Sequence, residues 1–92
     1  MILVSSIISI ENIEREIRIA IKTITNLDNL DNNANLLDQY LGIIPVDFIY
    51  IFDIIESKYS DKIYKILIDH SFHVMTIKNL SIAIFEAISV KE

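Results

Sequence analysis

The sequence predicts an all-α fold: a small four-helix bundle with a long loop between its first and second helices and a short third helix. Apolar residues, mostly isoleucine, recur at helical spacing in several stretches. Asn and Asp gather between residues 26 and 40, and the 92 residues include one glycine and one proline. This composition is typical of regular, packed structure, and the length indicates a single domain at residues 1–92.

We expect the first helix to span about Ser9 to Thr25. Its apolar and charged residues fall on opposite faces, as in an amphipathic helix that packs on a core. Ser9 is a favoured N-cap residue, and acidic residues in the first turn suit the helix dipole. The inward face comprises Ile10, Ile13, Ile17, Ala20, Ile21 and Ile24, and the outward face carries Glu11, Glu14, Arg15, Arg18 and Lys22.

The stretch from Asn26 to Tyr40 predicts a long loop. Asn and Asp side chains bond to the backbone in turns, and these bonds compete with helix formation. We expect four leucines to hold this loop against the core: Leu27, Leu30, Leu36 and Leu37. Loops longer than about 12 residues are uncommon unless they serve the fold or the function.

The second helix is expected to begin at Pro45 and to end at Lys58 or Tyr59. Proline suits the first helical position, and Asp47 in the first turn suits the helix dipole. We assign its inward face to Phe48, Ile51, Phe52 and Ile55. Since only part of a helix surface is buried in a small bundle, some of Val46, Ile49, Tyr50 and Ile54 should lie near solvent. The alternative is that the long loop, or an apolar leader segment at residues 1–8, covers them.

Two further helices complete the predicted bundle. A short third helix is expected from Asp61 to Asp69, with Ile63, Ile66 and Leu67 as its apolar residues. The fourth helix should open at Thr76, a good N-cap. Its apolar face comprises Ile77, Leu80, Ala83, Ile84, Ala87 and Ile88.

Composition excludes several classes of function. The net charge of −5, with its scattered Lys and Arg, argues against a nucleic-acid partner. The absence of cysteine excludes disulfides, zinc–thiolate sites and thiol nucleophiles, and fits a cytoplasmic protein. Residues 1–8 lack the basic start of a signal peptide, and Glu11, Glu14 and Arg15 follow too soon for a membrane span. We therefore expect no membrane partner.

Two motifs carry a resemblance to a known family. The first reads Leu41-Gly42-Ile43-Ile44-Pro45-Val46, and the second runs from Phe72 through Thr76 and Ile77 to Leu80. They resemble, in order and spacing, two signatures of the acyl carrier protein family. One is Leu-Gly-x-x-Ser-Leu/Ile at the start of the second helix; the other is Phe-x-x-hydrophobic-Thr-Val/Ile-x-x-Leu at the start of the last. The resemblance covers about Ser9 to Ser89, and places Ile51, Ile55 and Tyr59 where the family buries Leu, Leu and Phe.

The departures from the family pattern concern its chemistry. In the family, the serine at the position of Pro45 receives the phosphopantetheine arm, and an aspartate precedes it where this chain has Ile44. Ser57, Ser60 and Ser71 lie about three helical turns or more further along the chain. The resemblance therefore implies a carrier fold without carrier chemistry and without a cofactor.

Two groups of residues match metal-site patterns in part, and each has a simpler explanation. Asp31, Asn33 and Asn35 match the first positions of a calcium loop, but Leu36 and Gly42 stand where glycine and glutamate are required. A turn-rich loop explains these residues better. Asp69, His70 and His73 are the second candidate site. Two histidines without a third firm ligand are more often surface residues than metal ligands. We expect no metal, and no arrangement of residues indicates an enzyme.

We therefore expect a non-catalytic, acyl-carrier-like protein-interaction module, unable to carry phosphopantetheine at the usual position. Acyl-carrier-related proteins are encoded beside bacterial peptide-maturation enzymes. By analogy with them, we expect an accessory role in peptide maturation or natural-product biosynthesis. The expected partner is a biosynthetic or peptide-modifying enzyme. The expected partner-binding residues are Val46, Asp47, Ile49, Tyr50, Asp53 and Glu56, the acidic ones steering a basic partner.

Three alternatives stay open at this point. The chain is an unrelated helical bundle in which Pro45 simply starts a helix. Or it is a functional carrier modified at a non-standard serine. Or it is a helical immunity or antitoxin-type protein, which would bind one cognate toxin and lack a carrier-like loop.

Overall fold

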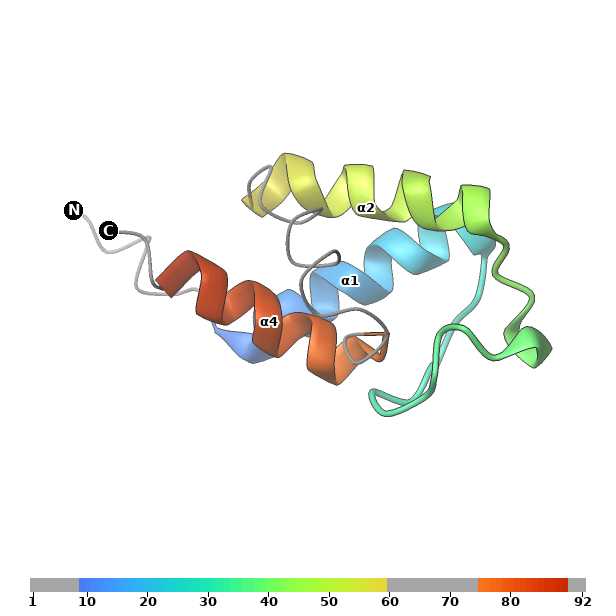
Figure 1. The fold of residues 1–92 in the computed structure, drawn as a ribbon, viewed down its shortest axis with the longest axis horizontal. Coiled ribbons are helices and arrows are strands. Elements are labelled where there is room, and N and C mark those ends of the chain that lie inside the picture. Colours follow the sequence, from blue (N-terminus) through green and yellow to red (C-terminus); the bar gives the residue numbers. More distant parts are fainter. Residues whose placement is uncertain (1–8, 60–74, 90–92) are drawn as a thin grey trace.

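The computed structural model describes residues 9–59 and 75–89. These residues form three α-helices, α1 (Ile10–Thr25), α2 (Pro45–Tyr59) and α4 (Ile77–Ser89), and one short 3-10 helix, η2 (Gln39–Leu41). Both α2 and α4 pack against α1 (Figure 1). The described part of the chain is thus all-helical, without strands, as predicted. The helix expected from Asp61 to Asp69 and the leader segment at residues 1–8 lie outside the described residues, so a four-helix bundle is not confirmed.

α1 begins and ends as its sequence predicts. The Ser9 hydroxyl oxygen accepts a hydrogen bond from the Asn12 N–H at 3.2 Å, which satisfies one of the free donors of the first turn. Asn26 follows the helix in the left-handed conformation, with φ of 67°, and its N–H donates to the Lys22 carbonyl. The inward side chains Ile13, Ile17, Ala20 and Ile21 are fully buried or nearly so.

α2 begins at Pro45, also as predicted, and its first turn is closed by a reciprocal pair of bonds. The Asp47 carboxylate accepts the Ile44 N–H at 3.1 Å, and the Asp47 N–H donates to the Ile44 carbonyl at 2.9 Å. This is one half of a capping box, in which the third helical residue reaches back to the N-cap backbone. At the start of α4, the Thr76 hydroxyl oxygen accepts the Asn79 N–H at 3.0 Å, which confirms Thr76 as the cap.

The core lies between the three helices. α2 contributes Ile51, Phe52 and Ile55, as predicted, and the rings of Phe48 and Phe52 are 5.8 Å apart. Phe48 and Ile54 are half-buried and pack against this core. The remaining buried apolar residues outside α1 are Leu36, Met75, Ile77, Leu80, Ala83 and Ile84.

The long loop between α1 and η2 is fastened to the rest of the molecule by main-chain bonds. The Leu36 N–H donates to the Met75 carbonyl at 2.8 Å, and the Lys78 N–H donates to the Asn32 carbonyl at 2.9 Å. The Asn32 side-chain oxygen also accepts a hydrogen bond from the Arg18 guanidinium. Asn32 therefore links the loop to both α1 and α4.

The leucines of the loop behave differently from one another. Leu36 is buried, and Leu27 and Leu30 are half-buried against the core, as predicted. The prediction was wrong for Leu37, whose side chain is 42% exposed. Leu36 and Leu37 are the two central residues of a turn that the hydrogen bond from the Asp38 N–H to the Asn35 carbonyl closes, and only Leu36 reaches the core.

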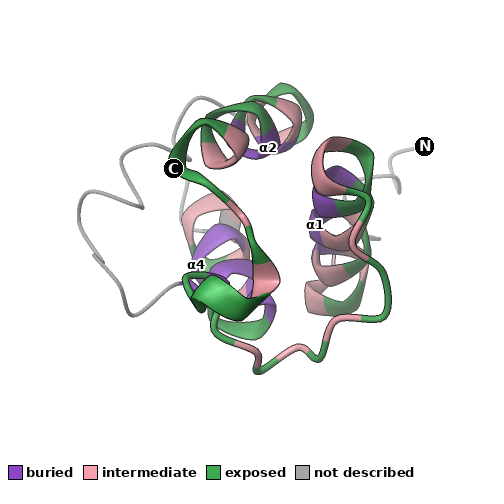
Figure 2. Cartoon of the chain, turned by 90° about the vertical axis from the view of Figure 1, so that its right-hand side faces the viewer, coloured by how far each residue is buried: buried purple, intermediate pink, exposed green. Residues whose placement is uncertain are grey.

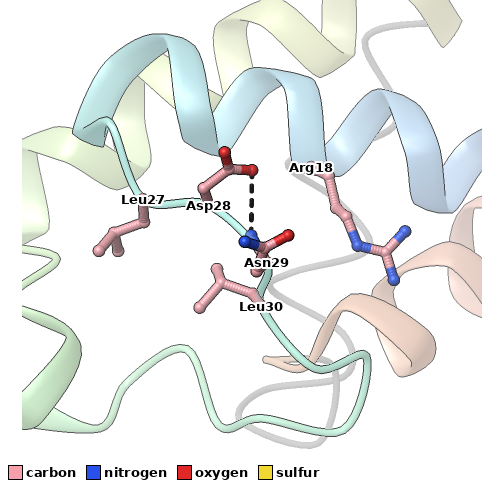
Figure 3. A pocket seen from close by; sticks show the side chains of 5 residues that line it. All are labelled: Arg18, Leu27, Asp28, Asn29 and Leu30. Carbon is pink, nitrogen blue, oxygen red and sulfur yellow. Dashed lines mark hydrogen bonds between the residues drawn. The ribbon is translucent and has the colours of Figure 1, made fainter.

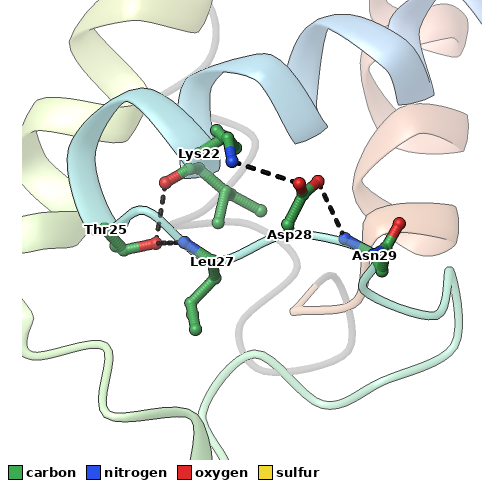
Figure 4. Close-up of polar contacts among 6 residues, drawn as sticks. Lys22, Thr25, Leu27, Asp28 and Asn29 are labelled. Carbon is green, nitrogen blue, oxygen red and sulfur yellow. Dashed lines mark hydrogen bonds and ion pairs between the residues drawn. The ribbon is translucent and has the colours of Figure 1, made fainter.

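Side chains of the loop stabilise its turns. The Asp31 carboxylate accepts the Asn33 N–H, and the Asn35 side-chain oxygen accepts the Leu37 N–H. These are the Asx turns that the turn-rich interpretation of this segment predicts. At the start of the loop, the Thr25 hydroxyl accepts the Leu27 N–H and Lys22 pairs with Asp28 at 3.1 Å (Figure 4).

The described residues contain neither a group of metal ligands nor a helix that could span a membrane. Within residues 9–59 and 75–89, no three His, Asp or Glu side chains are grouped closely enough to hold a metal ion. Asp69, His70 and His73 lie outside these ranges. Of the described helices, none combines the length and the apolar character that crossing a membrane requires.

Candidate interaction surface

The outward face of α2 is apolar. Val46, Ile49 and Tyr50 are all exposed, Ile49 at 53% and Tyr50 at 54%. With Asp53, which is also exposed, they follow the three- and four-residue spacing that places side chains on one side of a helix. In Figure 2 exposed residues lie on the outer side of α2, and its buried residues face the other two helices. The loop therefore does not cover this face.

Exposed apolar side chains also occur in the segment before α2. Tyr40 is 91% exposed and Ile44 is also exposed, whereas Leu41 and Ile43 are half-buried against the core. Half-buried and exposed side chains alternate here. Since Leu41 and Ile43 face the core, their neighbours Tyr40 and Ile44 face solvent. Tyr40 and Ile44 are not among the residues predicted from the sequence, although the alternation of half-buried and exposed residues in this segment would have indicated them.

η2 holds Tyr40 in place through local bonds. The Asp38 carboxylate caps this short helix by accepting the Tyr40 N–H at 3.0 Å. Gly42 ends it with φ of 74°, a conformation that favours glycine, and its N–H donates to the Gln39 carbonyl. Residues 42–44 join η2 to the start of α2, and in Figure 1 η2 lies below that end of the helix.

We call the exposed apolar side chains of α2, Val46, Ile49 and Tyr50, the apolar surface; Leu37, Tyr40 and Ile44 are exposed in the segment before it. Among the described residues, the other large hydrophobic side chain that is exposed is Ile19 on α1, at 47%. Single exposed apolar residues such as Ile19 are normal on a protein surface, whereas a group of them indicates an interaction site.

The predicted acidic residues take different positions. Asp53 is exposed on the same side of α2 as Ile49 and Tyr50, and the half-exposed Glu56 lies one turn further on. Asp47 is half-buried, and its carboxylate is used in the first turn of the helix, where it bonds to the Ile44 N–H. Asp53 and Glu56 therefore contribute charge beside the apolar surface, and Asp47 also stabilises the helix that carries it.

Charge is distributed unevenly along the chain. No Lys, Arg or His occurs between Thr23 and Ser57. The same stretch holds six acidic residues: Asp28, Asp31, Asp38, Asp47, Asp53 and Glu56. Because the whole chain carries a net charge of −5, the rest of it is close to neutral. The apolar surface thus lies within an acidic stretch of the sequence.

Pro45 stands at the first position of α2 with its ring exposed. It offers no hydroxyl there, and the serines with described side chains lie elsewhere. Ser9 caps α1, Ser81 is buried in α4, and the exposed Ser57 donates its hydroxyl to the Ile54 carbonyl near the end of α2. In the described part of the chain, no serine lies near the start of α2.

A small hollow lies where α1 meets the loop, lined by Arg18, Leu27, Asp28, Asn29 and Leu30 (Figure 3). Its volume is about 20 Å³, room for about one water molecule, whereas small-molecule sites measure several hundred Å³. In Figure 3 the two leucines point to one side and Arg18 to the other. This hollow is therefore a packing feature rather than a ligand site.

Among the residues that the structure describes, two groups have shifted pKa values, and neither belongs to the apolar surface. The Lys22 ammonium donates to the Asp28 carboxylate, and with the Asn29 N–H it lowers the pKa of Asp28 below its usual 3.8. Partial burial, together with the nearby Glu16 carboxylate, raises the pKa of Tyr59 above its usual 10.0. Glu16 also pairs with Lys58 at 3.3 Å, so this group of charges joins α1 to the end of α2.

No protein-family model, no curated protein and no solved structure matches this chain. The resemblance to acyl carrier proteins consequently stays a prediction. Its support is the register of the residues and their burial.

Proposed function

We propose that this chain is a non-catalytic, acyl-carrier-like protein-interaction module. It lacks the carrier serine and acts by contact with a protein partner. The observation that carries the proposal is the position of Pro45: an exposed residue without a hydroxyl at the first position of α2, where a carrier would hold its arm. No cofactor is required for such a role.

The burial pattern of α2 supports the carrier register. Ile51 and Ile55 are buried, and Tyr59 is half-buried against the core, at the three positions where carriers bury Leu, Leu and Phe. The start of α4 gives the same support, since Thr76 is a cap and Ile77 is buried. A one-residue shift would move these side chains by about 100° around their helices, away from the core.

The interaction role is supported by the exposed apolar side chains. Val46, Ile49 and Tyr50 supply contact area, and Asp53 and Glu56 supply charge on the same side of α2. The long loop between α1 and α2, with its own exposed residues, favours this proposal over an immunity or antitoxin-type protein. The accessory role in bacterial peptide maturation or natural-product biosynthesis rests on analogy with carrier-related proteins of those systems.

The experiment that tests the proposal is a loading assay on a pair of variants. The wild-type chain, Pro45→Ser and the double variant Ile44→Asp/Pro45→Ser are each incubated with coenzyme A and a promiscuous phosphopantetheinyl transferase. Intact mass then shows whether the arm was attached. We expect no change in the wild type and a gain of one phosphopantetheine in the double variant, which regains the Asp-Ser pair of the family.

Each other outcome has a definite meaning. A gain of mass in the wild type would show a true carrier modified at another serine, of which the exposed Ser57 is a candidate. If the double variant is folded by circular dichroism and still gains no mass, the carrier register is wrong. Pro45 then simply starts a helix.

A further inference from the structure

We draw no further inference here: the strongest candidate, the exposed apolar face of α2 formed by Val46, Ile49 and Tyr50, carries nothing beyond the proposed function, because nothing in the structure shows what covers it.

Discussion

α1 and α2 are nearly equal in length, 16 and 15 residues, but their outward faces differ. α1 buries Ile13, Ile17, Ala20 and Ile21 and turns charged residues to solvent, with Ile19 as its exposed large apolar side chain. α2 buries its inward residues equally well, and yet its outward face carries Val46, Ile49 and Tyr50. The core thus accounts for the inward residues of both helices, and the outward apolar residues of α2 require another explanation.

The charged outward residues of the two helices differ as well. α1 mixes signs, with Glu11 about one turn from Arg15 and with Lys22 in its last turn, which is typical of a helix face that remains in water. The outward charges of α2, up to Ser57, are all acidic. A face that is apolar and of one charge sign is typical of binding, because it attracts one class of partner and repels others.

The largest effect that tests this comparison is on stability. Ile17→Ala in α1 and Ile55→Ala in α2 each remove a fully buried side chain, so each should lower the free energy of unfolding by about 2–5 kcal/mol. Ile19→Ala and Ile49→Ala remove exposed side chains and should stay within about 0.5 kcal/mol of the wild type. Urea denaturation followed by circular dichroism measures all four.

A loss at Ile49 as large as that at Ile55 would contradict the comparison, since it would mean that the outward face of α2 is covered. If the alanine variants of Ile17 and Ile55 do not fold, Ile→Val replaces them. A loss of about 0.5–1.5 kcal/mol is then expected at each buried position.

An intermediate effect is expected at the starts of the two helices. Ser9→Ala removes the side chain that caps α1 and should cost about 1 kcal/mol. Asp47→Ala removes the carboxylate that accepts the Ile44 N–H at α2 and should cost about 0.5–1 kcal/mol. The same denaturation measurement applies, with Asp47→Asn as the matched control, because an amide oxygen also accepts this bond. Equal losses in Asp47→Asn and Asp47→Ala would show that the charge matters rather than the hydrogen bond.

The smallest effect is a pH dependence where α1 meets the end of α2. Burial first, and the Glu16 carboxylate second, raise the pKa of Tyr59 above its usual 10.0. Because the folded pKa is raised, this contribution to stability is fully present below pH 10 and is lost as pH rises through the folded value. Phenolate absorbance during a pH titration, with Tyr59→Phe to identify the step, measures it. Glu16→Gln should lower the pKa of Tyr59, and a step at or below 10.0 in the wild type would contradict the expectation.

Local chemistry made the helices predictable. Ser9, Pro45 and Thr76 each start a helix at the expected position, because capping and the fixed φ of proline act within one turn of chain. The inward residues of α1 and α2 follow from the helical spacing of apolar residues. These predictions required no knowledge of the tertiary structure.

The path of the loop was less predictable, because it depends on contacts between distant residues. Adjacent leucines, Leu36 and Leu37, are equivalent in sequence, and the main-chain bond from Leu36 to Met75 decides which of them is buried. The exposure of Tyr40 and Ile44 depends on the same placement. Four of the six predicted partner-binding residues, Val46, Ile49, Tyr50 and Asp53, are exposed together. Asp47 proved to be partly structural, and the exposure of Tyr40 in η2 was not predicted.

The fastening of the loop has a consequence for how the sequence can vary. The bonds from Leu36 to Met75 and from Lys78 to Asn32 join main-chain atoms, which every residue except proline supplies as donor and every residue supplies as acceptor. Many side chains of the loop could therefore be substituted during evolution without a change in its backbone path. Side-chain requirements remain at the buried Leu36, at Asn32, which accepts a hydrogen bond from Arg18, and at Asp31 and Asn35, whose oxygens accept bonds in the turns of the loop. The exposed side chains of Leu37 and Tyr40 can then change without loss of the core.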